Sequence, residues 1–210
     1  YTVEGNKTVG YEILEQLHCD APDWVLIPVG AGPLLVGCWK GFTEMKRLGW
    51  VQKLPSMIGV QAKGCAPIVK AFKEGRSTVE PWGSPRTVAS AIADPLQGYP
   101  QDGTLTLNTI KQSNGLAEAS SDDEILQAVK LLAETEGIFA EPAGAASIAA
   151  LDKLIRAGRL GKKDVVVCVV TGSGLKHPTA SMKICSEPFE IEPNMDELRK
   201  LLRFSHKSNN

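Results

Sequence analysis

The sequence has no long apolar run and almost no net charge. No hydrophobic stretch approaches the roughly 18 residues that a membrane-spanning helix needs, and no signal peptide opens the chain. The formal net charge is −1, so no overall field attracts nucleic acid or an anionic membrane. The basic residues near the end of the chain are interpreted as a solvated helix face (Arg199, Lys200, Arg203, Lys207). We therefore expect no nucleic-acid partner and no membrane partner.

The sequence also lacks paired cysteines, clustered histidines and an initiator methionine. Its five cysteines are odd in number and widely spaced, which predicts reduced core thiols and a reducing compartment (Cys19, Cys38, Cys65, Cys168, Cys185). Three distant histidines predict no metal site (His18, His177, His206). The start at Tyr1 suggests a processed chain or an expressed fragment. A cytoplasmic location is predicted, with an organelle stroma left open because a transit peptide would lie upstream.

What the sequence contains is typical of a globular α/β protein. In 210 residues, 43% are hydrophobic and 22% are charged, which is enough for one large domain or two small ones. Helical spacing, apolar runs and turn residues predict alternating helices and strands, and hence a three-layer sandwich with a mainly parallel sheet flanked by helices. The expected strands are 24–29, 57–61, 116–119 and 165–170, and the expected helices are 9–17, 34–48, 67–72, 87–92, 105–112, 121–136, 142–157 and 194–202. Residues 75–103 are otherwise read as loop.

Three segments are candidates for a ligand site. Gly30-Ala31-Gly32-Pro33-Leu34 lies between a strand and a helix, so it is either an anion cradle or a tight structural turn. Thr171, after the last strand, either meets a ligand or caps its turn. Glu141 precedes a helix whose small residues, Ala143 to Ala150, leave room for a flat ligand or for close packing on the sheet. The carboxyl ends of parallel strands share one edge, so a common pocket is expected there.

Several collinear motifs together resemble threonine synthase, a pyridoxal-phosphate enzyme of the tryptophan-synthase-β fold (fold type II). The resemblance covers Glu4 to about Lys176. The run around Glu141 is shared with threonine dehydratases, whereas the ordered set favours threonine synthase. The motifs are Glu4-Gly5-x-Lys7-Thr8, Pro28-Val29-Gly30, Gly59-Val60-Gln61-Ala62, Pro67-Ile68-Val69, Glu136-Gly137-Ile138-Phe139-x-Glu141-Pro142-Ala143 and Thr171-Gly172-Ser173-Gly174-Leu175-Lys176.

The resemblance implies pyridoxal 5′-phosphate as the cofactor and assigns six residues to its binding. Gly30, Ala31, Gly32 and Leu34 would cradle the phosphate, Thr171 would meet the pyridine nitrogen, and Glu141 would line the ring pocket. Two positions depart from the family pattern: Pro33 removes an N–H from the phosphate loop, and Asp94 stands where the family usually has Gly-Asn-Pro.

The family's Schiff-base lysine, which precedes Asp-Arg, is absent from these residues, and the resemblance does not assign that role to Lys176. We therefore predict no catalytic residue here. Residues 1–185 would be the C-terminal pyridoxal-phosphate-binding domain of the enzyme, and 186–210 an extension with a short helix.

The complete enzyme would convert O-phospho-L-homoserine and water to L-threonine and phosphate, and the isolated chain would be inactive. The expected partners are a phosphorylated amino acid, the missing N-terminal part, and a second copy in a full-length homodimer. Two alternatives remain: a serine or threonine dehydratase or racemase of the same cofactor group, and a non-catalytic binding or regulatory module.

Overall fold

The structure, a computed structural model, describes residues 1–184 and 189–205. A four-stranded sheet occupies its centre, with the strand order β3-β2-β1-β4. The strands are β1 (Trp24–Pro28), β2 (Ser56–Ala62), β3 (Leu116–Ser120) and β4 (Val166–Cys168). Each pairing between these strands is parallel, with Val25 opposite both Met57 and Val167. The predicted parallel sheet is confirmed.

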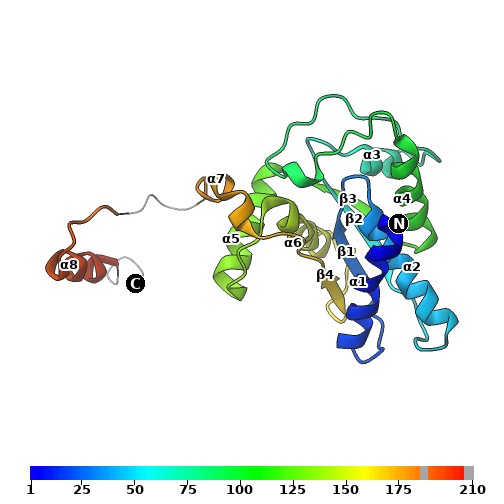
Figure 1. Cartoon of the computed structure of the whole chain (residues 1–210), viewed down its shortest axis with the longest axis horizontal. Helices are drawn as coiled ribbons and strands as arrows, with labels where there is room; N and C mark the ends of the chain where they lie inside the picture. Colours follow the sequence, from blue (N-terminus) through cyan, green and yellow to red (C-terminus); the bar gives the residue numbers. More distant parts are fainter. Residues whose placement is uncertain (185–188, 206–210) are drawn as a thin grey trace.

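Helices cover both faces of the sheet (Figure 1). On one side lie α1 (Thr2–Gln16), α2 (Pro33–Arg47), α3 (Pro67–Lys73) and α4 (Pro100–Gln112), and on the other lie α5 (Asp122–Glu136) and α6 (Pro142–Arg156). Shorter elements are the 3₁₀ turns η1 (Ser90–Ile92) and η2 (Gly174–Lys176) and the helix α7 (Pro178–Ser181). The three-layer α/β sandwich expected from the sequence is confirmed.

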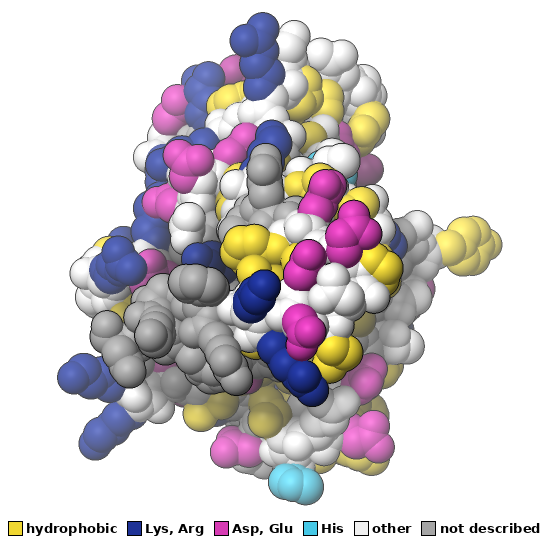
Figure 2. Space-filling model, turned by 90° about the vertical axis from the view of Figure 1, so that its left-hand side faces the viewer, with side chains coloured by type: hydrophobic (Ala, Val, Ile, Leu, Met, Phe, Trp, Pro, Cys, Tyr) yellow, Lys and Arg dark blue, Asp and Glu magenta, His cyan; other side chains and the backbone are white. Residues whose placement is uncertain are grey.

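The last helix, α8 (Met195–Ser205), lies apart from these layers in Figure 1. Figure 2 shows the face that carries it, where hydrophobic side chains lie beside acidic and basic ones. Among the described residues, no helix is both long enough and apolar enough to cross a membrane.

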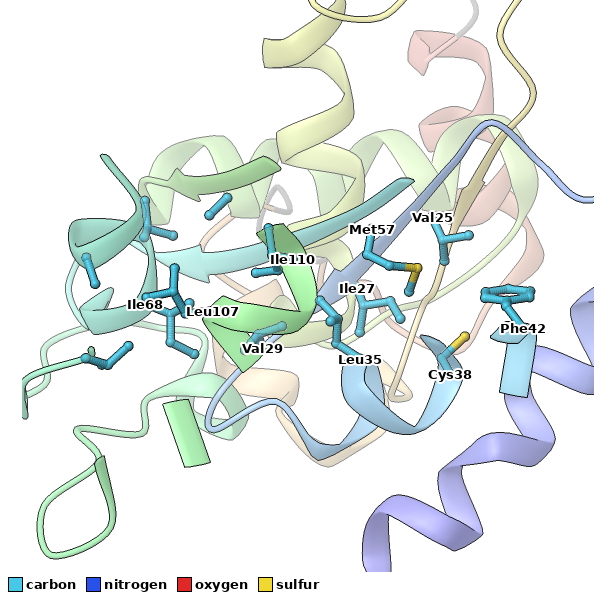
Figure 3. Close-up of a cluster of buried hydrophobic side chains, with 14 of the residues drawn as sticks. Val25, Ile27, Val29, Leu35, Cys38, Phe42, Met57, Ile68, Leu107 and Ile110 are labelled. Carbon is cyan, nitrogen blue, oxygen red and sulfur yellow. The ribbon is translucent and has the colours of Figure 1, made fainter. Parts of the chain in front are cut away.

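The central strand β1 sends alternate side chains into two separate cores. Val25, Ile27 and Val29 pack with α2 on one face (Figure 3), whereas Leu26 packs with α5 and α6 on the other. Burial of each such side chain contributes about 1.5–3 kcal/mol. The continuous apolar run of β1 therefore reflects burial on both faces, as predicted.

Helices α1 and α2 meet along a glycine seam formed by Gly10, Gly37 and Gly41. A Cβ atom at these positions would lie 2.6, 2.5 and 2.6 Å from the carbonyl oxygens of Cys38, Val3 and Lys7, respectively. Such distances lie far inside van der Waals contact. The two backbones therefore approach each other as closely as they do because these residues carry no side chain.

A charged network ties the exposed side of the same helix pair. The Lys7 ammonium contacts Glu4 at 2.8 Å and Glu44 at 3.0 Å, the Tyr11 hydroxyl donates to Glu44 at 2.5 Å, and Lys40 pairs with Glu4. Hydrogen bonds from Lys40 and Lys7 lower the pKa of Glu4 to about 2. The hydrogen bond from Tyr11, followed by that from Lys7, lowers the pKa of Glu44.

Local sequence signals predict several helix ends correctly. The capping box is present, since Glu124 N–H donates to Ser121 Oγ and Ser121 N–H donates to the Glu124 carboxylate. Gly137 ends α5 in the left-handed conformation, as expected. Cys19, Cys38, Cys65 and Cys168 are free thiols, and Cys185 lies outside the described residues.

Other boundaries are wrong. Helix α4 begins at Pro100 rather than near Leu105, because proline fits the first helical position, where no N–H is needed. The helix expected at 87–92 is reduced to the single turn η1. Strand β4 is shorter than the expected 165–170 because it lies at the edge of the described sheet and pairs only with β1.

Candidate functional site

The carboxyl ends of β1 and β4 bring two of the candidate segments to one edge of the sheet. Leu26 pairs with Cys168, and Val169 N–H donates to Leu26 O at 2.9 Å. The loop Gly30-Ala31-Gly32 follows β1 and Thr171 follows β4, so both segments lie at the carboxyl edge of two neighbouring strands. The fold therefore brings to one edge of the sheet two segments that are about 140 residues apart in the chain.

The segment Gly30-Ala31-Gly32, which we call the Gly30 loop, has backbone N–H groups without hydrogen-bond partners. The N–H groups of these residues and of Leu34 have no hydrogen-bond partner in the part of the chain that the structure describes. Gly32 is the N-cap of α2, with φ of 103°, a left-handed conformation that favours glycine. Pro33 occupies the first helical position and supplies no donor. Free N–H groups at a helix start, together with the helix dipole, favour an anion.

Asp94 lies beside this loop rather than away from it. A Cβ atom on Gly30 would be 3.2 Å from Asp94 Cβ. The Asp94 carboxylate accepts hydrogen bonds from Leu96 N–H at 2.9 Å and from the Tyr99 hydroxyl at 3.0 Å. These bonds hold the carboxylate within its own loop. Asp94 also adds to burial in raising the pKa of the nearby Cys65 thiol to about 11.

Thr171 is exposed, and its hydroxyl makes no hydrogen bond with any described residue. The cap of the following turn is Ser173, whose Oγ accepts from Leu175 N–H at 3.3 Å. The structural alternative for Thr171, a turn cap, is thus filled by a different side chain. The Thr171 hydroxyl is left available at the sheet edge.

Glu141 lies directly against the glycine that follows Thr171. Its N–H donates to Gly172 O at 3.0 Å, and a Cβ atom on Gly172 would be 2.3 Å from Glu141 Oε1. Glu141 is 9% exposed as a residue, and its side chain makes no hydrogen bond or ion pair with the described residues. It lines a cavity of about 170 Å³ together with residues in and beside η1, α6 and η2, namely Val88, Ser90, Ala91, Pro142, Ala143, Lys176 and His177.

The small residues that follow Glu141 are covered by the protein itself. Ala143, Ala145, Ala146 and Ala150 are all buried, and a Cβ atom on Gly144 would lie 3.1 Å from the backbone nitrogens of Thr171 and Gly172. The start of α6 therefore packs closely on the segment that follows β4. This arrangement favours the packing interpretation for the small residues, while Glu141 itself faces the cavity.

The described residues contain no group of three or more His, Cys, Asp or Glu side chains placed to hold a metal ion. Lys176 is exposed at the rim of the Glu141 cavity. The sequence analysis missed Gln61 and Thr106, two buried polar side chains that contact the Gly30 loop. The signal for Gln61 was one amide in an otherwise apolar strand, and Thr106 left no recognisable signal.

Comparison with known proteins gives consistent matches. Residues 1–172 match the family model described as "Pyridoxal-phosphate dependent enzyme". The chain is 42% identical over 203 residues to threonine synthase of Methanocaldococcus jannaschii, covering 97% of this chain and 49% of that protein. It is 44% identical over 202 residues to threonine synthase of Methanosarcina acetivorans, covering 96% and 49%. The chain thus spans about half the length of these curated relatives.

Among solved structures, an L-serine ammonia-lyase from Rhizomucor miehei superposes with a TM-score of 0.67 at 25% identity, covering 86% of this chain and 56% of that one. Threonine deaminase isoform 2 from Solanum lycopersicum gives a TM-score of 0.70 at 22% identity, covering 87% and 48%. The latter similarity concerns the fold alone.

Proposed function

We propose that this chain, which belongs to the family of pyridoxal-phosphate dependent enzymes, forms the cofactor-binding half of a threonine synthase. The observation that carries the proposal is the run of N–H groups at the start of α2 that have no partner among the described residues, at the sheet edge where β4 also ends and leads to the unpaired Thr171 hydroxyl. Relatives named threonine synthase, at 42% and 44% identity, support this activity over that of the structural neighbours.

The residues fit the cofactor in distinct ways. Gly30, Ala31, Gly32 and Leu34 would bind the phosphate through backbone N–H groups, a geometry suited to an anion at a helix start. The Thr171 hydroxyl would donate to the pyridine nitrogen as a neutral partner, and the Glu141 side chain would bound the ring pocket. When bound, the cofactor supplies an electron-withdrawing ring that stabilises carbanions.

The whole protein would convert O-phospho-L-homoserine and water to L-threonine and phosphate. The lysine that holds the cofactor covalently would belong to the missing part, so this chain alone would not turn over substrate. A direct test assays a full-length protein containing this sequence with O-phosphohomoserine, serine and threonine. Threonine formation from O-phosphohomoserine supports the proposal, whereas 2-oxoacid formation from serine or threonine would assign a dehydratase instead.

The missing part would dock along the open edge of β4. Side chains of Val166, Val167 and Cys168 are only half-buried, and successive residues belong to opposite cores, so both layers are incomplete at this edge. In the described sheet this edge has unpaired backbone groups and half-buried apolar side chains on both faces. Another strand or helix that packed there would cover both. The coverage of about half of each relative is consistent with such a partner. A homodimer of the full-length protein and a cytoplasmic location are part of the same proposal.

Cofactor binding by this chain is testable by calorimetric titration with pyridoxal phosphate and, in parallel, with pyridoxal lacking the phosphate. Saturable binding that depends on the phosphate is expected, without the hydride-reducible adduct that a covalent imine would leave. Equal affinity for both compounds, or binding of neither, would argue against a phosphate cradle at the Gly30 loop.

A further inference from the structure

A buried side-chain amide donates a hydrogen bond to the carbonyl group of Gly30. Gln61, near the end of β2, is 1% exposed. Its Nε2 donates to Gly30 O at 3.2 Å, while its Oε1 accepts from Ile68 N–H at 2.9 Å and from Val69 N–H at 3.1 Å. Gln61 therefore links the Gly30 loop to the start of α3 through hydrogen bonds at both ends of its side chain.

The next carbonyl group in the loop is held by a buried hydroxyl. Thr106, in the middle of α4, is 1% exposed, and its Oγ1 lies 2.7 Å from Ala31 O and 3.1 Å from Asp102 O. The shorter contact identifies Ala31 as the main acceptor. The Thr106 side chain also occupies the space beneath Gly32, where an added Cβ atom would lie 2.2 Å from Thr106 Oγ1.

Holding these two carbonyls fixes the direction of two N–H groups. In a trans peptide unit, the C=O and the following N–H point in opposite directions, and the described chain has no cis peptide. With Gly30 O bound inward by Gln61, Ala31 N–H points outward. With Ala31 O bound inward by Thr106, Gly32 N–H points outward as well. Both N–H groups lack a partner among the described residues.

We propose that Gln61 and Thr106 are positioning residues that aim the N–H groups of Ala31 and Gly32 at the phosphate of the bound cofactor. This inference rests on the proposed function, because it requires the loop to bind phosphate. The inference goes beyond that function in one respect. The affinity for the anion would depend on the side chains of Gln61 and Thr106, which bind carbonyl groups of the loop and do not contact the ligand.

The test compares three substitutions on α4 in the full 210-residue chain. Thr106→Val removes the donor and keeps the shape, Thr106→Ser keeps the donor, and Thr109→Val is the matched control. Thr109 is buried in the same helix, and its hydroxyl donates to Leu105 O at 2.9 Å and to no other described residue. The readout is the ratio of affinities for pyridoxal phosphate and for pyridoxal. Unlike overall stability, this ratio reports on the phosphate contact alone.

Thr106→Val is expected to weaken pyridoxal phosphate binding about tenfold, the value of one hydrogen bond that orients a donor, and to leave pyridoxal binding unchanged. Thr106→Ser and Thr109→Val should keep the wild-type ratio. If Thr106→Val does not fold, Thr106→Ala serves instead. It also removes the hydroxyl that binds Ala31 O, places no charge beside the loop, and should lower the same ratio.

The outcomes separate this inference from the proposed function. A wild-type ratio in Thr106→Val, or an equal loss for both ligands, would overturn the positioning role while leaving the phosphate cradle intact. Amide resonances of Ala31 and Gly32 in the ¹⁵N-labelled chain, followed during titration with inorganic phosphate, give an independent readout. If the wild-type chain shows neither phosphate-dependent binding nor a shift of these resonances, the cradle and the positioning role both fail.

Discussion

Replacing Gly32 by alanine would test the fit between the Gly30 loop and α4. Gly32 has φ of 103°, and an added Cβ atom would lie 2.2 Å from Thr106 Oγ1 and 2.5 Å from Thr106 Cγ2. The left-handed conformation costs a residue other than glycine about 1–2 kcal/mol. Crowding of a buried side chain adds about 1–3 kcal/mol. We therefore expect Gly32→Ala to lower the free energy of unfolding by about 2–5 kcal/mol.

Gly49→Ala is the matched control for the backbone term. Gly49 also has a positive φ, of 79°, but an added Cβ atom would meet nothing within 4 Å. It should therefore show the conformational cost alone. Urea titrations of both variants, followed by far-ultraviolet circular dichroism, give the two free energies from midpoints at a common slope. If Gly32→Ala loses no more stability than Gly49→Ala, then an added Cβ atom at Gly32 does not clash with the Thr106 side chain, and the reasoning is wrong.

Three further predictions concern separate parts of the molecule. Thr171→Val should impair turnover of the full-length enzyme and leave the unfolding free energy within about 0.5 kcal/mol, because the hydroxyl is exposed and makes no bond among the described residues; normal turnover would remove Thr171 from the ring-binding role. Cys38, whose pKa burial raises to about 12, should resist alkylation at pH 8 until urea unfolds the chain, as mass spectrometry of the labelled peptides would reveal. The pKa of Glu4 in the folded chain is lowered from 4.5 to about 2, so the stabilising effect of its ion pairs is complete above pH 4.5 and is lost as the pH falls toward 2. The difference in unfolding free energy between wild type and Glu4→Gln should therefore shrink over that range. A difference that does not vary with pH would contradict the ion pairs described for α1 and α2.

Signals that act over a few residues were enough to predict much of the fold. The capping box at Ser121, the stop at Gly137 and the apolar run of β1 each depend on local hydrogen bonding or on burial of a short segment. Parallel pairing followed from the alternation of strands and helices. These features could be read from the sequence because the interactions that determine them lie within single elements or between successive ones.

The features that sequence analysis missed depend on contacts between distant segments. Gln61 bonds Gly30, 31 residues away, and Thr106 bonds Ala31, 75 residues away. The amide of Gln61 stands out in an apolar strand, but the residues around Gln61 and Thr106 do not indicate which segment either side chain contacts. The length of β4 likewise depends on which strands lie beside it, and the glycines and prolines before Pro100 obscured the start of α4. Residue type alone identified the loop, but not the side chains that orient its backbone.

The glycine seam between α1 and α2 has a mechanical consequence. Because the backbones of Gly10, Gly37 and Gly41 already touch carbonyl groups of the neighbouring helix, neither helix can advance toward the other, and the charged network from Lys7 resists their separation. The two helices should then move as one rigid unit, which includes the Gly32 end of α2. A shift of α2 at its Gly32 end would therefore require α1 to shift with it.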